Sequence, residues 1–278
     1  MSTSGFSGPG SGEGDSRFTG SIPDLYEELM VPLIFAEPAE VLAEAVVARD
    51  PGNVLETAAG TGVLTRAIRG RSPELPITAT DLNQPMIDRA IATSDLEGVA
   101  WQQADAVDLP FADASYDVVV CQFGAMFFPD KTQGYAEARR VLRHGGAFLF
   151  NVWDRVGTNE IADVITRALV LADPAHPLEF MARTPHGYHD PRKITRDLFR
   201  AGMDAQITVH EGVARSTPAR AALAFCQGTP LRGEIEKHPT LDLDVATSIA
   251  TEALQAAWGS ARTASPTRWL QVLATPKR

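Results

Sequence analysis

The segment Asn53-Val54-Leu55-Glu56-Thr57-Ala58-Ala59-Gly60-Thr61-Gly62 has the pattern of a short strand, a turn of small residues and the start of a helix. In such a turn the backbone can approach a ligand closely, because Ala and Gly carry little or no side chain. Free N–H groups at the start of the following helix favour an anionic group nearby. The segment therefore predicts a nucleotide-type ligand at the carboxyl end of a first strand, with a ligand-free tight turn as the alternative.

Strands and helices alternate regularly around this turn. We expect strands at 54–56, 77–80, 99–102, 116–121 and 147–152. The helices expected between them cover 63–70, 84–92 and 131–142, and another precedes the turn at about 36–49. Strand–helix alternation with short turns predicts a parallel sheet that helices cover on both faces.

The composition excludes several classes of protein. The chain has 278 residues, and 25 basic against 35 acidic residues give a net charge of −10. Such an acidic surface repels phosphate backbones and anionic lipids, so we expect neither nucleic acid nor membrane insertion. Two cysteines, Cys121 and Cys226, form neither a disulfide framework nor a metal-binding pattern. Without a signal peptide or apolar span, the chain is expected in the cytoplasm and to hold no metal.

The chain is predicted to have two parts. Residues 1–20 are rich in Gly and Ser and nearly free of large apolar groups, which predicts a disordered tail. Residues 21–278 show neither an internal repeat nor a linker and are predicted to form one domain, with its core at about 36–153. Beyond Trp153 the alternation weakens, and only two more strands are expected, at about 205–209 and 268–274.

Acidic residues at strand ends narrow the choice of nucleotide ligand. A dinucleotide fingerprint that starts at Gly60 requires a third glycine where this chain has Thr65. Glu56 would repel a pyrophosphate and suits a cationic ligand or a bridging water. Asp81, at the end of the second strand, is placed for ribose hydroxyls, or alternatively caps the next helix. Asp105, after the third strand, is placed for the amine of adenine, although Asp also commonly opens a turn.

In order and spacing, these segments resemble the class I S-adenosylmethionine-dependent methyltransferases, and within them the UbiE-like small-molecule group. Five motifs carry the resemblance, which extends over residues 53–153: Glu56 to Gly62, Asp81-Leu82-Asn83, Asp105 to Phe111, Ser115 to Val120 and Arg140 to Gly146. The resemblance implies a Rossmann-like, doubly wound sheet of seven strands, mostly parallel with an antiparallel C-terminal strand. It also implies that the strands at 205–209 and 268–274 form a hairpin, with helical lid insertions at about 155–200 and 215–260.

The same resemblance implies roles for individual residues in binding S-adenosylmethionine. Gly60 and Gly62 would lie under the methionine moiety. The other expected contacts of the cofactor are Tyr26, Glu56, Ala58, Asp81 for the ribose, Leu82 and Met86 for the adenine faces, Asp105 and Ala106 for the adenine amine, and Gln122 beside the sulfonium. One departure is that family members often carry Gly or Cys where this chain has Ala58-Ala59, and Ala is small enough to keep the site.

The acceptor pocket is expected after the fourth and fifth strands and under the lid. Its predicted aromatic lining is Phe123, Phe127, Trp153 and Tyr188, for which ordinary core packing is the alternative. His186 and His189, with Gln122, are the candidate catalytic groups, because a histidine can take a proton from a phenol or amine. The alternative is that these histidines are exposed loop residues.

The function expected from the sequence is transfer of a methyl group to an O, N or C atom of a small, partly apolar or aromatic acceptor by in-line displacement. The partner is then a small molecule, and a homodimer is possible. Three alternatives remain open: a methyltransferase that acts on RNA or protein, a nicotinamide-dependent oxidoreductase, and a cofactor-binding protein without catalysis.

Overall fold

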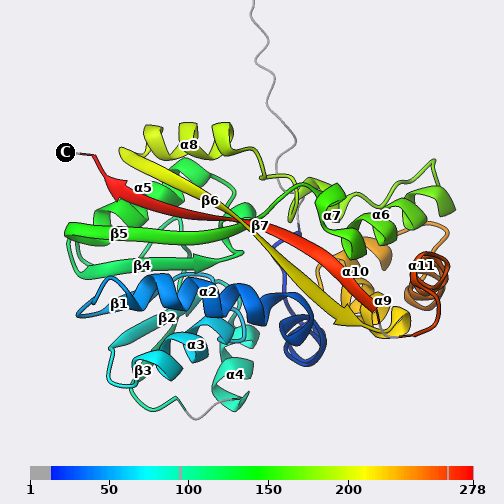
Figure 1. Cartoon of the computed structure of the whole chain (residues 1–278), viewed down its shortest axis with the longest axis horizontal. Helices are drawn as coiled ribbons and strands as arrows, with labels where there is room; N and C mark the ends of the chain where they lie inside the picture. Colours follow the sequence, from blue (N-terminus) through cyan, green and yellow to red (C-terminus); the bar gives the residue numbers. More distant parts are fainter. Residues whose placement is uncertain (1–13, 94–95, 262, 278) are drawn as a thin grey trace, which may run out of the picture.

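The computed structural model describes residues 14–93, 96–261 and 263–277, and it contains one sheet of seven strands in the order β3-β2-β1-β4-β5-β7-β6 (Figure 1). The strands are β1 (Val54–Glu56), β2 (Ile77–Asp81), β3 (Val99–Gln103), β4 (Tyr116–Gln122), β5 (Leu142–Trp153), β6 (Met203–Ser216) and β7 (Thr263–Pro276). Strands β1 to β5 run parallel, while β7 is antiparallel to both β5 and β6. The predicted fold class is confirmed.

Helices cover both faces of the sheet because its central strands are buried on both sides. Apolar residues of α2 (Ala36–Val47) and α3 (Val63–Arg71) pack with Val54 and Val118 on one face. Residues of α5 (Lys131–Val141) and α8 (Pro191–Arg200) belong to the cluster on the other face. α4 (Gln84–Thr93) connects β2 to β3 and contacts both strands. This double cover explains the continuous apolar runs in β4 and β5.

A π-helix lies at the N-terminal side of the domain. The short α1 (Ile22–Leu25) continues into the π-helix η1 (Tyr26–Phe35), which continues into α2. Pro32 lies inside η1 and offers no N–H to the helix ladder, and a wider helical turn is one way to accommodate that loss.

The C-terminal hairpin is much longer than the two strands expected at 205–209 and 268–274. β6 and β7 pair over 14 residues each, from Met203 with Pro276 to Ser216 with Thr263. The first part of β7 was not predicted from the sequence, because it contains Pro266, a residue that is uncommon in strands, and polar neighbours. A proline is tolerated there because β5 ends its pairing at Trp153 with Trp269, so β7 has one unpaired edge beyond that point.

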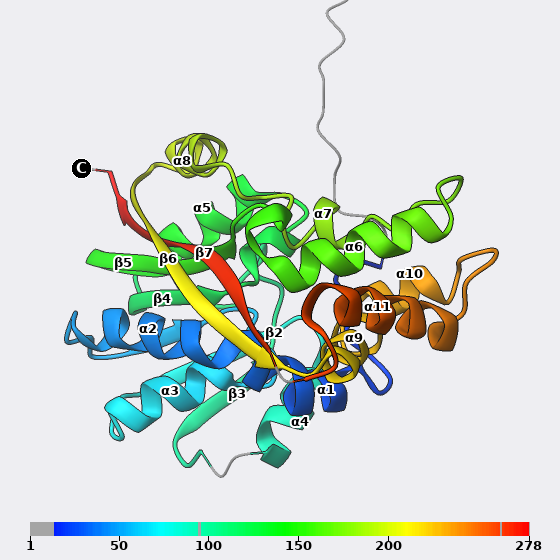
Figure 2. The same ribbon diagram turned by 45° about the vertical axis from the view of Figure 1, so that its right-hand side comes forward.

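Most of the lid helices gather beyond one end of the sheet, where the hairpin reaches them (Figures 1 and 2). They are α6 (Glu160–Ala172), α7 (Phe180–Arg183), α9 (Pro218–Gln227), α10 (Leu231–Ile235) and α11 (Leu243–Trp258), preceded by the 3₁₀ turn η3 (Val156–Thr158). α8 falls within the predicted lid segment 155–200, yet it packs on α5 and β6 and covers the sheet. The first lid segment therefore ends before α8.

Part of the predicted tail, residues 14–20, belongs to the described part of the chain. Residues 1–13 lie outside the described part of the chain. Residues 14–20 make defined contacts, among them an ion pair between the buried Asp15 and the half-buried Arg183. The low apolar content of this stretch predicted disorder. It did not indicate that Asp15 pairs with Arg183, which lies 168 residues later in the chain. Within the described ranges, no helix is both long enough and apolar enough to span a bilayer.

Candidate functional site

The turn after β1 has a left-handed backbone, which its glycines adopt without strain. Gly60 and Gly62 have φ values of 57° and 82°, and Ala58 has a φ of 52°. A Cβ at Gly62 would lie 2.8 Å from the side chain of Trp101, so both the backbone and the available space require glycine there. The turn therefore brings backbone to the end of the sheet where a side chain would block a ligand.

Glu56, the last residue of β1, is held directly behind this turn. Its carboxyl oxygen accepts a hydrogen bond of 2.6 Å from the hydroxyl of Thr65, the residue that replaces the third glycine of a dinucleotide fingerprint. Burial is the main cause that raises the pKa of the Glu56 carboxyl to about 8. The hydrogen bond from Thr65 and the charge of Arg66 oppose the rise, and the nearby Asp81 adds to it. Without a ligand this carboxyl is mostly protonated at neutral pH, and a cationic ligand would favour its ionised form.

Asp81, the last residue of β2, points into the same region. One carboxylate oxygen accepts from the N–H of Gly60 at 2.9 Å, and the other accepts from the N–H of Asn83 at 2.8 Å. Burial raises the pKa of Asp81, and these backbone donors oppose the rise. The oxygen bonded by Gly60 keeps a further lone pair, which can accept from a ribose hydroxyl, whereas the other oxygen also accepts from the side-chain nitrogen of Asn83 at 3.3 Å.

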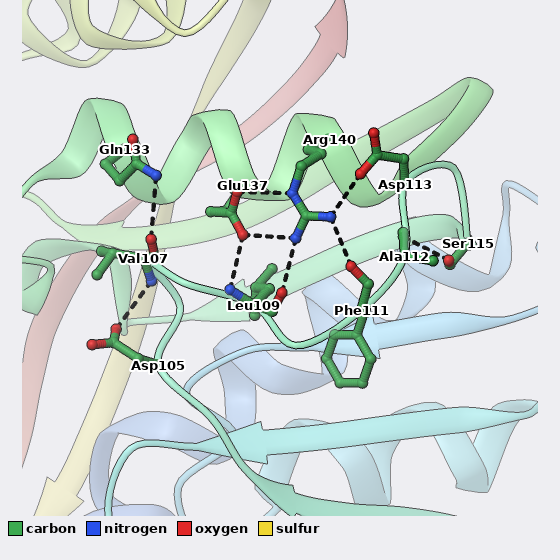
Figure 3. Close-up of polar contacts among 10 residues, drawn as sticks. All are labelled: Asp105, Val107, Leu109, Phe111, Ala112, Asp113, Ser115, Gln133, Glu137 and Arg140. Carbon is green, nitrogen blue, oxygen red and sulfur yellow. Dashed lines mark hydrogen bonds and ion pairs between the residues drawn. The ribbon is translucent and has the colours of Figure 1, made fainter.

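The loop after β3 is fixed by a single guanidinium group (Figure 3). Arg140 of α5 donates to the carbonyl groups of Leu109 and Phe111 at 2.8 and 2.7 Å. It also bonds both carboxylate oxygens of Glu137, and Glu137 accepts from the N–H of Leu109 at 2.8 Å. Asp105, at the start of this loop, accepts from the N–H of Val107 at 3.0 Å. Loop 105–113 is thus tied to α5 at several backbone groups.

These elements meet at one continuous cavity. Nine predicted cofactor residues line it: Tyr26, Ala58, Gly60, Asp81, Leu82, Met86, Asp105, Ala106 and Gln122. We call this region the donor half. Glu56 and Gly62 do not line the cavity and lie behind the turn that does. The structure therefore gathers most of the predicted cofactor residues at the carboxyl ends of four neighbouring strands.

The other half of the cavity is apolar and aromatic, and we call it the acceptor half. Phe123 and Trp153 stack with ring centroids 4.0 Å apart and an interplanar angle of 10°. Phe35 of η1 lies against both rings, at 5.5 and 5.8 Å. Phe127, in the 3₁₀ turn η2 (Ala125–Phe127), lines the cavity as predicted. The lid closes this half with Ile161, Phe180, Met181 and Phe225.

Gln122, at the end of β4, lies where the two halves meet. Its side-chain amide donates to the carbonyl of Phe35 at 3.0 Å. Its amide oxygen is buried and has no hydrogen-bond partner within the described part of the chain. A buried acceptor without a donor is unfavourable by about 1–3 kcal/mol, so this oxygen is suited to a donor on a bound ligand.

The two candidate histidines have different environments. His186 is buried and lines the acceptor half, with Nδ1 at 2.7 Å from the carbonyl oxygen of Asp154. A carbonyl only accepts, so Nδ1 carries the proton and Nε2 keeps a lone pair. Burial lowers the pKa of His186 to about 4, which keeps the ring neutral. His189 bonds the carbonyl of His186 at 2.7 Å and does not line the cavity, contrary to its predicted catalytic role.

Tyr188 was predicted in the acceptor pocket, and the structure places it in the core. Its hydroxyl accepts from Tyr135 at 3.2 Å and donates to Asp197 at 3.1 Å. The ring is buried and does not line the cavity. Its position next to two histidines in the sequence gave no sign of this, because consecutive residues of an irregular loop can point to opposite sides.

Several lining residues were not predicted from the sequence. Phe35 and Phe225 have apolar spacing that is equally typical of core residues, so nothing in the sequence marked them for a pocket. Ser16 and Phe18 also line the cavity, and they lie in the segment predicted to be disordered. An aromatic residue shortly before the first helix was the one available signal for Phe18.

Comparison with known proteins agrees with this geometry. The sequence model of the family described as "Methyltransferase domain" matches residues 55–150, which include β1 to β4 and most of β5. The C-methyltransferase UbiE of ubiquinone and menaquinone biosynthesis from Burkholderia mallei is 30% identical over 202 residues, which are 66% of this chain and 79% of that protein. The chain belongs to the class I S-adenosylmethionine-dependent methyltransferases.

One further curated relative and one solved structure are similar to this methyltransferase. The demethylmenaquinone methyltransferase of Deinococcus radiodurans is 39% identical over 106 residues, which are 37% of this chain and only 44% of that protein. The chain thus spans less than half the length of this curated relative. A solved methyltransferase of Thermotoga maritima, dependent on S-adenosylmethionine, has a TM-score of 0.53 at 16% identity and covers 91% of this chain and 96% of that one. This last likeness supports the fold alone.

The donor half of this methyltransferase fits the donor of its family. S-adenosylmethionine carries a ribose diol, an adenine amine and a cationic methionine moiety. Asp81 offers two carboxylate oxygens, Asp105 offers an acid on the fixed loop, and the unpartnered oxygen of Gln122 accepts one further donor. Glu56 would supply negative charge behind the methionine moiety once ionised. In the described ranges, no group of three or more His, Cys, Asp or Glu side chains is arranged to bind a metal ion.

Proposed function

We propose that this methyltransferase transfers a methyl group to an O, N or C atom of a small, partly apolar or aromatic acceptor. The observation that carries the proposal is the continuity of the cavity, which joins the strand-end residues Gly60 and Asp81 to the aromatic residues Phe123 and Trp153 without an intervening wall. A planar, apolar acceptor suits the stacked pair of rings. When bound, S-adenosylmethionine supplies a methyl group already activated by the sulfonium charge.

The chain's own contribution to the reaction is alignment and exclusion of water. The lid residues Phe180 and Met181 and the π-helix residue Phe35 bury the acceptor half, and all three have apolar side chains. Holding two reactants in line is worth up to about 7–11 kcal/mol when their geometry is ideal. No strongly basic group is required for this task if the acceptor loses its proton easily.

His186 is proposed to orient the acceptor. Its Nε2 keeps a lone pair, because Nδ1 holds the proton and bonds the carbonyl of Asp154. A hydroxyl or amine of the acceptor can donate a hydrogen bond to Nε2. This bond fixes the orientation of the acceptor and leaves the lone pair of its reacting O or N atom directed away from the imidazole. With a pKa near 4 the ring is a weak base, so His186 acts as a hydrogen-bond acceptor more than as a proton acceptor.

Two alternatives are less well supported. A macromolecular acceptor needs an open, accessible surface at the reacting atom, whereas helices α6, α7 and α9 contribute residues around the acceptor half. The net charge of −10 further disfavours RNA. A nicotinamide cofactor is disfavoured because a dinucleotide fingerprint that starts at Gly60 requires a third glycine where this chain has Thr65.

A screen for transfer of radiolabelled methyl groups tests the proposal. The acceptors to include are reduced quinones and phenols, because the relatives are named for demethylmenaquinone methylation and for ubiquinone and menaquinone biosynthesis, together with amines and fatty acids. We expect transfer to at least one planar apolar acceptor. Transfer to RNA or protein, with none to any small molecule, would contradict the proposal.

A further inference from the structure

The segment of residues 14–20 lies across the cavity, and we call it the N-terminal strap. Its first anchor is Asp15, a buried carboxylate that accepts from Arg183 at 2.9 and 3.2 Å and from the hydroxyl of Thr184. Arg183 also bonds Glu234 of α10 at 3.2 Å. A buried acid that is paired with a guanidinium and bonded by a hydroxyl forms a specific contact, which fastens the strap to the lid.

The second anchor of the strap is Asn83, two residues after Asp81. The side-chain oxygen of Asn83 accepts from the N–H of Phe18 at 3.2 Å, and its side-chain nitrogen donates to the carbonyl of Ser16 at 3.1 Å. That nitrogen also lies 3.3 Å from a carboxylate oxygen of Asp81. One amide therefore links the strap to the acid that is suited to a ribose.

Side chains of the strap complete a wall of the cavity. The ring of Phe18 meets Tyr26 edge-on at 5.9 Å and Phe127 at 5.8 Å, and both Phe18 and Ser16 line the cavity. Tyr26 belongs to the donor half and Phe127 to the acceptor half. Phe18 thus packs at the boundary of the two halves, on the same side as η1.

We propose that the N-terminal strap is a part of the cofactor site that closes over the nucleoside of S-adenosylmethionine, with Phe18 as an additional binding residue. The proposal rests on the cofactor of the family and is independent of the acceptor. A ligand cannot leave the donor half past the strap while both anchors hold, so release requires that the contacts of Asp15 and Asn83 break. The strap then sets how long the cofactor and its product stay bound.

The test measures binding and release of S-adenosylhomocysteine by the full chain. Asp15→Ala removes the lid anchor and Phe18→Ala removes the wall contact, while Asn83 and Asp81 stay intact. We expect each variant to release the ligand about tenfold faster and to bind it more weakly, with an association rate that is unchanged or higher. Loss of the site by misfolding would instead lower the association rate. The matched control is Arg17→Ala, because Arg17 is an exposed residue of the same strap, and we expect no change in either rate.

Hydrogen exchange of the wild-type chain provides a second measurement that needs no variant. The amide of Phe18 donates to Asn83, so it should exchange more slowly when S-adenosylhomocysteine is bound. Equal exchange with and without ligand, or unchanged release rates in both variants, would contradict the proposed role of the strap and leave the cofactor assignment intact. Failure of the wild-type chain to bind S-adenosylhomocysteine would contradict the cofactor assignment and the strap together.

Discussion

Glu137 and Arg140 lie one turn apart in α5, and their side chains are joined by two hydrogen bonds of 2.8 Å each. The pair also bonds the backbone of the loop that carries Asp105, as Figure 3 shows. The hydrogen bonds of Arg140 lower the pKa of Glu137. A loop without regular secondary structure is therefore kept in place largely by one charged pair.

Arg140→Met should destabilise the protein, and the loss in free energy of unfolding should be larger at neutral than at acidic pH. A carboxyl whose pKa is lowered on folding contributes stability above its unfolded pKa of about 4.3, and this contribution is lost as the pH falls through the folded value. Since the pair is partly exposed, we expect a loss of about 1–2 kcal/mol at pH 7 and a smaller difference near pH 3. Urea unfolding at both pH values measures it. Arg139→Met, an exposed neighbour, serves as the control, and an equal loss there would contradict the role of the pair.

Glu56→Gln should remove a decrease in the free energy of unfolding that the wild type shows as the pH rises. The pKa of Glu56 is raised on folding, so the folded protein keeps a proton that the unfolded chain has already released. Stability therefore falls as the pH rises from about 4.3 through about 8. We expect the wild type to lose more free energy of unfolding than Glu56→Gln between pH 6 and 9, measured without ligand. The exposed Glu44→Gln should follow the wild type, and parallel curves for all three proteins would refute the assignment.

His186→Phe should lower turnover without weakening the binding of the cofactor. Removing the Nε2 acceptor is expected to reduce kcat/KM for a hydroxylated acceptor by about ten- to a hundredfold, and His186→Gln should recover part of it. Protonation near pH 4 also removes the lone pair, so the wild-type rate should fall as the pH drops below about 5. His189→Phe is the control, because His189 does not line the cavity. Equal losses in both variants would point to a disrupted loop instead.

Two glycines at opposite ends of α3 should respond in opposite ways to alanine. Gly62→Ala places a Cβ 2.8 Å from Trp101 at a φ of 82°, and we expect a loss of about 1–3 kcal/mol. Gly70→Ala meets nothing within 4 Å and lies in the helix, so it should gain up to about 1 kcal/mol. Thermal unfolding of the two variants makes the comparison. A neutral Gly62→Ala would show that the turn can relax.

The donor half was predictable because it depends on local signals. Strand β1, the small-residue turn and the helix after it lie within about 20 residues, and the acids Asp81 and Asp105 follow their strands directly. The parallel order of the strands then places these residues at one edge of the sheet. Local pattern and topology together therefore locate each residue without knowledge of side-chain packing.

The acceptor half was only partly predictable, because it depends on packing between distant segments. Phe35 and Phe225 meet the cavity from helices that are almost 200 residues apart in the sequence. His186 and Tyr188 are two residues apart, and one lines the cavity while the other is buried in the core. The composition around Asp15 predicted disorder, whereas in the structure its carboxylate pairs with Arg183. None of these outcomes follows from spacing or propensity.

The length of the C-terminal hairpin has a consequence for how the enzyme can change. Ser216 and Thr263 are paired at the last register position of β6 and β7, so residues 217–262 leave and rejoin the sheet at adjacent points. This insertion carries α9, α10 and α11 and contributes Phe225 and Pro230 to the acceptor half, while the donor half is built from other segments. Replacing the insertion between these two endpoints should therefore change the wall of the acceptor half, while the chain keeps the residues that line the donor half.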